Sequence, residues 1–219
     1  MAKMERQLPG SRADFDRPLL AHLPRRLCIP HLQRSPPHMP RFVALFRGIN
    51  VGKAKRIAMV DLRALLATLG YTDVQTLLNS GNAIFEGRSE PGLTHAQRIR
   101  SAVAQELGVD AFVIVKSAKD IAGAVAENRL AETTHDASRL LVAFTDGPKA
   151  LAALEPMGQQ AWTPEQLLVG KHAAFLWCAN GILESKLAVA LLKGLAESGT
   201  TRNWATVQKI HAMLHAAEA

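Results

Sequence analysis

The chain has 219 residues, of which 48% are apolar, 21% charged and 5% aromatic, as in an ordinary globular protein. This length accommodates one large or two small domains, and no stretch approaches the roughly 20 consecutive apolar residues of a membrane-spanning helix. The net charge is +7, but residues 1–40 hold seven Lys and Arg against three acidic side chains, which leaves only +3 for the remainder. Composition therefore excludes a membrane-spanning protein, and it argues against nucleic-acid binding, which usually concentrates more positive charge.

The first 40 residues differ in composition from the rest. Seven of the eleven prolines lie there, and proline at this density interrupts helices and strands because it fixes φ and removes a backbone donor. We therefore expect residues 1–40 to be a disordered N-terminal tail or an upstream stretch that is not translated. Met39 precedes the first convincing strand by two residues, so we expect translation to start there.

The chain has two cysteines, and only Cys178 lies outside the tail. Without a disulfide framework, a reducing compartment and hence a cytoplasmic location are expected. Cys178 ends an apolar run and has no evident positive neighbour to lower its pKa. We expect a buried core thiol there, and no catalytic nucleophile.

Residues 41–130 show a regular alternation of apolar patterns. The expected elements are a strand at 42–46, a helix at 59–69, strands at 74–78 and 83–85, a helix at 94–107, a strand at 112–115 and a helix at 118–128. The order β-α-β-β-α-β plus one helix matches the ferredoxin-like arrangement. We predict a first α/β-plait domain at residues 41–130.

A second round follows from residue 138 to residue 219. Its expected elements are a strand at 140–144, a short helix at 149–154, strands at 167–169 and 174–178, a helix at 183–197 and a last helix that starts near Arg202. This recurrence suggests a second plait. The predicted fold class is α+β, with two ferredoxin-like (α-β plait) subdomains packed together.

Three strings in residues 41–219 are distinctive: Leu-Phe-Arg-Gly-Ile-Asn-Val-Gly at 45–52, Asn-Ser-Gly-Asn at 79–82 and Thr-Thr-Arg-Asn-Trp-Ala-Thr-Val at 200–207. In order and spacing they resemble the three signatures of the bacterial domain-of-unknown-function 1697 family. The resemblance covers essentially residues 41–216. It implies two α/β-plait domains in one compact unit, and it implies no particular activity.

The loop after the first strand carries four cations and two glycines. Backbone donors at a helix start, together with Arg and Lys, can form an anion site, and Arg47 is best suited because a guanidinium binds anions in a bidentate manner. The loop is not a P-loop, since three residues separate Gly48 from Gly52 and Ala54 follows Lys53. The alternative is a solvated loop whose glycines serve backbone shape alone.

Two further polar strings have both a structural and a ligand-binding interpretation. Ser80, Gly81 and Asn82 suit a tight turn, and Ser80 and Asn82 would also offer hydrogen bonds to a ligand. In the last string either threonine can cap the final helix and so place Arg202 at its positive end. The alternative is that Trp204 fills the interface between the domains while Arg202 and Asn203 tie loops together.

Metal binding has little support in the sequence. His211 and His215 stand four residues apart on a helix, but no glutamate and no third ligand accompany them. We expect a solvated helix face there, and neither a metal nor another cofactor.

The leading functional hypothesis is a pocket between the two domains that binds a small phosphorylated or carboxylated ligand. Whether it catalyses a reaction stays open. The candidate ligand-binding residues all lie in loops or at helix starts: Arg47, Asn50, Lys53, Ser80, Asn82, Lys186, Arg202 and Asn203.

Two other classes of function stay open. A protein-interaction or regulatory module would use the same polar strings only to hold the domains together. A nucleic-acid-binding module is less well supported, because the aromatic-rich strand motif of RNA-binding plaits is absent. The oligomeric state is left open.

Overall fold

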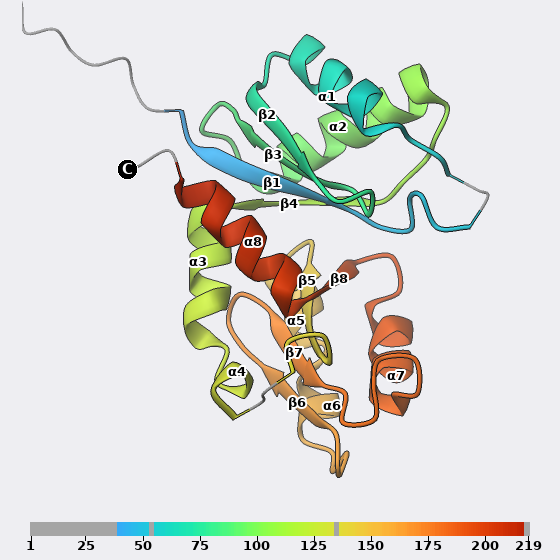
Figure 1. Ribbon diagram of the computed structural model, residues 1–219, viewed down its shortest axis with the longest axis vertical. Coiled ribbons are helices and arrows are strands. Elements are labelled where there is room, and N and C mark those ends of the chain that lie inside the picture. Colours follow the sequence, from blue (N-terminus) through green and yellow to red (C-terminus); the bar gives the residue numbers. More distant parts are fainter. Residues whose placement is uncertain (1–38, 53–54, 134–135, 217–219) are drawn as a thin grey trace, which may run out of the picture. The chain divides into compact units, whose positions relative to one another are not determined.

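The computed structural model describes residues 39–52, 55–133 and 136–216. Residues 1–38 of the expected N-terminal tail lie outside the described residues. These described residues form one compact unit that contains two four-stranded antiparallel sheets and their helices (Figure 1). None of the helices among the described residues combines the length and apolar character that crossing a bilayer requires.

The first sheet has the strand order β2-β3-β1-β4. Its strands are β1 (Arg41–Phe46), β2 (Thr72–Leu77), β3 (Asn82–Glu86) and β4 (Val113–Ser117). The helices of this half are α1 (Met59–Thr68), α2 (Gly92–Leu107) and α3 (Ala118–Glu127). The element order is the one predicted from the apolar pattern.

The second sheet repeats this arrangement as β6-β7-β5-β8. Its strands are β5 (Leu140–Thr145), β6 (Gln166–Val169), β7 (Ala174–Trp177) and β8 (Gly199–Asn203). Its helices are α4 (Leu130–Thr133), α5 (Pro148–Ala152), α6 (Glu155–Gly158), α7 (Lys186–Leu195) and α8 (Trp204–His215). The short helices α4 and α6 were not expected from the sequence.

The last helix begins two residues after its predicted start near Arg202, and it is preceded by a strand that was not predicted. Residues Gly199–Asn203 form strand β8, which pairs with β5, and α8 begins only at Trp204. Neither threonine caps this helix. The cap is Asn203, whose side chain accepts a hydrogen bond from Thr206 N at 2.9 Å. The strand escaped prediction because its inward positions hold Thr200 and Arg202, which give no apolar alternation.

Strands β1 and β5, which lie inside their sheets, are buried on both faces and divide the core into three layers. Phe42, Ala44 and Phe46 of β1 face the layer under α1 and α2, whereas Val43 and Leu45 face the layer that the two sheets share. Strand β5 alternates in the same way between the shared layer and a third layer under α7. This alternation follows from the two-residue period of strand side chains.

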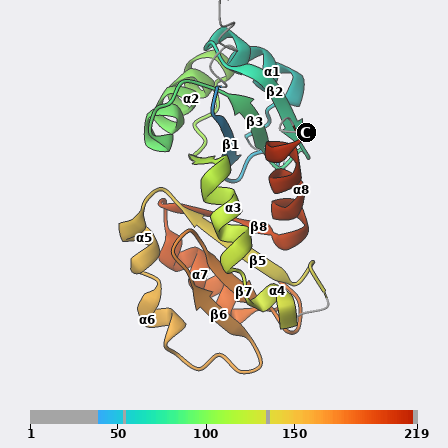
Figure 2. The same ribbon diagram turned by 90° about the vertical axis from the view of Figure 1, so that its left-hand side faces the viewer.

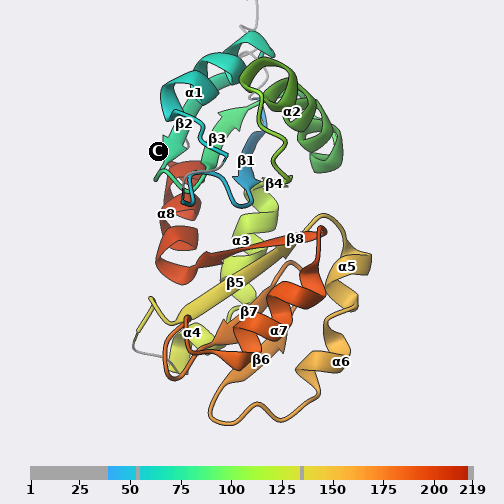
Figure 3. The ribbon, with the colours of Figure 1, turned by 90° about the vertical axis from the view of Figure 1, so that its right-hand side faces the viewer.

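Helices α3 and α8 complete the shared layer. They lie side by side between the two sheets in both views (Figures 1 and 2). Their buried residues Ile121, Trp204 and Ile210 pack with side chains from both sheets. Helix α7 covers the other face of the second sheet (Figure 3). The central core therefore joins residues that precede and follow position 130.

Local chemistry explains the ends of the long helices. Ser117 caps α3 in a capping box with Asp120, as expected for a serine after a strand. Helix α2 ends at Gly108, whose φ of 66° is the left-handed conformation expected of a terminal glycine. It begins two residues before the expected Thr94, after Pro91, and so has no side-chain cap at its start.

A buried histidine lies in the layer under α2. His95 is 0% exposed and contacts the rings of Phe42 and Tyr71. Its Nε2 lies 3.1 Å from the carbonyl oxygen of Arg88, which can only accept, so Nε2 carries the proton. The other nitrogen, Nδ1, then accepts from the Tyr71 hydroxyl at 3.0 Å. Desolvation holds the pKa of His95 below its ordinary value of 6.5.

We expect this histidine to make folding stability depend on pH. The native state binds fewer protons than the unfolded chain once the pH drops below 6.5, because the unfolded histidine titrates first. Stability is therefore complete above that pH and is lost as pH falls below it, by up to about 1.4 kcal/mol per pH unit. His95→Gln should flatten the dependence of unfolding free energy on pH between roughly pH 7 and 5. Equal slopes for wild type and variant in urea unfolding would contradict this account.

Candidate functional site

Arg202 is a buried hub of hydrogen bonds between the two sheets. It projects from β8 toward the end of β1, is 8% exposed, and uses all five of its N–H donors. Nη2 donates to the carbonyl oxygens of Phe46 at 2.7 Å and Gly81 at 3.2 Å, and Nε donates to Asn82 Oδ1. Nη1 donates to Thr200 and Thr201. No N–H group is left for a ligand.

The side-chain amide of Asn82, which accepts from Arg202, also has hydrogen-bond partners within the protein for its nitrogen. It is 0% exposed, and its Nδ2 donates to Leu77 O at 2.8 Å and to Ser80 Oγ at 3.2 Å. The predicted turn is present, with φ of 81° at Gly81. A Cβ at Gly81 would come within 2.5 Å of Ile49, so the close approach of two loops also requires glycine there.

The basic loop after β1 forms hydrogen bonds to the start of β8 and to the β2–β3 turn. Arg47 Nη1 donates to the carbonyl oxygen of Gly199 at 3.2 Å. Asn50, with φ of 57°, bonds through its side chain to the backbone of Ile57 and to Asn79 O. Lys53 lies outside the described residues. A cavity of about 340 Å³ opens beside Asn50 and the start of α1, with Arg56 on its wall.

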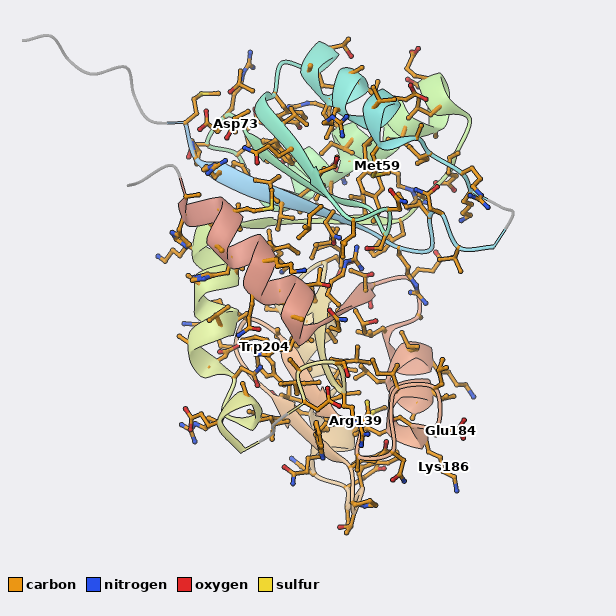
Figure 4. All side chains as sticks on the ribbon, viewed as in Figure 1. Met59, Asp73, Arg139, Glu184, Lys186 and Trp204 are labelled. Carbon is orange, nitrogen blue, oxygen red and sulfur yellow. The ribbon has the colours of Figure 1, made fainter. Side chains whose placement is uncertain are left out.

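The remaining candidates lie in two different places. Asn203 caps α8, and Trp204 is buried in the shared layer. Lys186 is exposed at the start of α7, which lies on the opposite face of the second sheet (Figure 4). The structure therefore brings Arg47, Ser80, Asn82, Arg202 and Asn203 into one interface and leaves Lys186 apart. These contacts are the ones that the interaction-module alternative expects.

A larger cavity, of about 420 Å³, lies elsewhere between the residues of the two sheets. None of the predicted site residues lines it. Its walls from the first half are Pro91, Gly92, Leu93, Val115, Lys116 and Asp120, and its walls from the second half are Thr145, Asp146, Gly147, Pro148, Leu151, Lys171 and His172. We call it the Lys116 cavity.

Lys116 has an unusual environment for a lysine. It is half-buried on β4 opposite Val43, on the face of the sheet that is turned toward the shared layer. Desolvation lowers the pKa of Lys116, although the charges of Asp120 and Asp146 act to raise it. Among the described residues, no hydrogen bond or ion pair is found for its ammonium group. The cavity thus holds a cation that is short of partners.

His172 is held in the cavity wall by a carboxylate. Glu127, the last residue of α3, accepts hydrogen bonds from the backbone N–H groups of Lys171, His172 and Ala173, and its Oε2 lies 3.2 Å from His172 Nδ1. Desolvation acts to raise the pKa of Glu127, but these hydrogen bonds outweigh it and keep that pKa below its ordinary value. The ionised Glu127 therefore fixes both the β6–β7 turn and the imidazole ring.

Two glycines allow this close packing. A Cβ at Gly123, in the middle of α3, would lie 2.6 to 2.8 Å from atoms of the His172 ring. A Cβ at Gly92 would lie 2.3 Å from Val115 O, so α2 can begin against β4 only with glycine there. The uncapped first turn of α2 consequently forms part of the cavity wall, where its N–H groups and dipole favour negative charge.

Sequence reasoning missed this cavity for a definite reason. Lys116 follows Ile114 on the same face of β4, so the alternation of the strand already placed a lysine toward the interior. Asp146 and His172, in contrast, come from the end of β5 and the β6–β7 turn. Only the packing of the two sheets brings them to Lys116.

We expect Arg202 to matter for stability through its five hydrogen bonds. Arg202→Ala leaves buried carbonyl and amide oxygens without donors and should cost about 3 kcal/mol or more of unfolding free energy. The control is Arg100→Ala, which removes an exposed ion pair with Asp110 and should cost about 1 kcal/mol at most. Comparable losses for the two variants in urea unfolding would refute the structural role.

Gly123→Ala tests the packing of His172. A helix-interior glycine replaced by alanine normally gains roughly 0.5–1 kcal/mol, but here the new methyl group must displace the imidazole ring from Glu127. We expect no such gain and a shifted His172 ring signal in proton NMR. Gly194→Ala in α7 is the control, since a Cβ there meets only ordinary contacts and should gain stability. A gain in both variants with an unmoved His172 signal would show that the ring is not held as described.

Residues 39–175 match the model of a protein family described as "Protein of unknown function (DUF1697)". The chain is also similar to the solved structure of a conserved bacterial protein from Streptococcus pneumoniae, with 27% identity and a TM-score of 0.67. That alignment covers 80% of this chain and 99% of the other. The comparison with curated proteins found no match. Since the family model spans more than half of the sequence, the chain belongs to the DUF1697 family of proteins of unknown function.

Proposed function

We propose that this protein binds a small ligand with one carboxylate or phosphate group in the Lys116 cavity. In this proposal residues 41–130 and 138–219 are two ferredoxin-like domains, and the ligand lies between them. The observation that carries the proposal is Lys116, a desolvated ammonium group that has no hydrogen bond or ion pair among the described residues, in a cavity of about 420 Å³. A ligand anion would supply the partner that the protein does not.

The surroundings of Lys116 support an anion of limited charge. Lys171 and the first turn of α2 also line the cavity and add positive potential to it. Asp120 and Asp146 line the same cavity and would repel a polyanion, although they can accept hydrogen bonds from hydroxyl or amine groups of a ligand. This balance favours a small metabolite over a nucleic-acid backbone. The ligand would come from the cytoplasm, as the sequence predicts.

The cavity also contains a group suited to proton transfer. A carboxylate that holds one nitrogen of an imidazole sets the orientation of the ring, and a histidine so held is a frequent general acid or base. His172 and Glu127 have this relation. The proposal therefore assigns anion binding to Lys116 and makes His172 the first residue to examine if a reaction is found.

A specific observation favours a second function for the signature residues. All donors of Arg202 and the whole amide of Asn82 are used inside the protein. Their role in this account is to hold the two sheets together, as an interaction module would require. The two functions are compatible, because the Lys116 cavity lies at another part of the interface.

The test is a thermal-shift measurement on the full chain with phosphate, acetate and butanoate at two salt concentrations. A ligand at a hundred times its Kd should add about 2.7 kcal/mol of stability to the wild type. Lys116→Met keeps the apolar stem, so the free variant should fold as stably as the wild type, but it should show no shift with the anion. Lys119→Met, which alters an exposed lysine three residues away, should respond like the wild type. An equal response of the Lys116→Met protein would rule out the proposed site.

A further inference from the structure

A second, smaller cavity adjoins the Lys116 cavity. It has a volume of about 190 Å³ and lies between α2 and the edge strand β4. Its walls are mainly apolar and include Leu93, Ala96, Phe112, Val113 and Val115. The two cavities share Leu93, Val115 and Asp146 in their walls, so they meet at this point.

From this arrangement we propose that the ligand is a medium-chain carboxylate, whose carboxylate group binds at Lys116 and whose unbranched hydrocarbon chain lies in the apolar cavity. This inference rests on the proposed function and adds the class of ligand. A polar cavity with a cation and an adjoining apolar cavity are complementary to the two ends of an amphipathic anion.

Leu93 provides a second argument. It lies in the first turn of α2, is 56% exposed, and is the large apolar side chain common to both cavities. An exposed leucine at a helix start contributes little to folding, because its surface stays in water. A hydrocarbon chain that passes from one cavity into the other would cover it. This explains why an apolar residue stands between two open cavities.

The volume sets the length of the chain. A group of about the size of a water molecule takes up roughly 30 Å³, so 190 Å³ accommodates about six such groups. With its carboxyl carbon, the fitting ligand has about seven carbons. The far end of the apolar cavity is bounded by Gln97 and Arg100, whose polar groups would meet a longer chain. Affinity should therefore stop rising near that length.

Isothermal titration of the full chain with acetate, butanoate, hexanoate, octanoate and decanoate tests the inference. Burial of each added CH₂ group should raise affinity about fourfold up to roughly seven carbons, after which the gain should cease. Leu93→Gln should reduce the affinity for octanoate at least tenfold and leave that for acetate unchanged. Val189→Gln is the matched control, because Val189 is a similarly exposed apolar residue on α7 and lines neither cavity.

The outcomes separate this inference from the proposed function. Binding of acetate with no gain along the series, or an octanoate affinity that Leu93→Gln leaves intact, would overturn the medium-chain ligand while the anion site at Lys116 stands. Failure of every carboxylate and of phosphate to bind would overturn both. If affinity still rises with chain length in the Lys116→Met variant, the inference is also overturned, since the carboxylate would then not bind at Lys116.

Discussion

The arrangement of the two sheets depends on a single buried guanidinium group. Burial lowers the pKa of Arg202 to about 10, so it remains charged at neutral pH although its partners are neutral oxygens of β1, β8 and the turn into β3. A charge can be buried in this way only when all its donors are satisfied. That requirement fixes the end of β1, the β2–β3 turn and β8 at one point. At the other end of β1, Arg41 donates from Nη1 to carbonyl groups in the last turn of α8 and forms an ion pair with Asp73.

The Lys116 cavity is a consequence of the same packing. Residues near Arg202 satisfy one another, whereas the opposite edge of the interface leaves space between β4, α2 and the end of β5. Polar groups along one interface therefore have two roles. Arg202, with a full set of acceptors, holds the fold, whereas in the proposed function Lys116, which lacks them, binds a ligand. The carboxylate of Glu127 combines both roles. It fixes the β6–β7 turn through hydrogen bonds to backbone N–H groups, and it also holds the ring of His172, which lines the cavity.

Much of the fold could be predicted from the sequence, and little of the cavity. Apolar runs such as Phe42–Phe46 identified the buried strands, and Ser117 and Gly108 identified helix ends, because these signals are local. Strand β8 was missed because its interior positions hold Thr200 and Arg202, whose burial depends on partners far away in the chain. The site was predicted at the loops with the most polar residues, yet the polar groups of Asn82 and Arg202 form hydrogen bonds within the protein. Lys116, Asp146 and His172 share no sequence pattern, so only the folded chain relates them.

The most direct test of this account is the pKa of Lys116 itself, measured by carbon NMR of the full chain with labelled lysine side chains. The account predicts a value below the ordinary 10.5 in the free protein, because the ammonium group is desolvated without a partner. Addition of a carboxylate ligand should raise that value, because the bound anion favours the charged amine, while the exposed Lys119 should stay unchanged. An ordinary pKa for Lys116 in the free protein, or a value that no carboxylate or phosphate alters, would contradict the central claim.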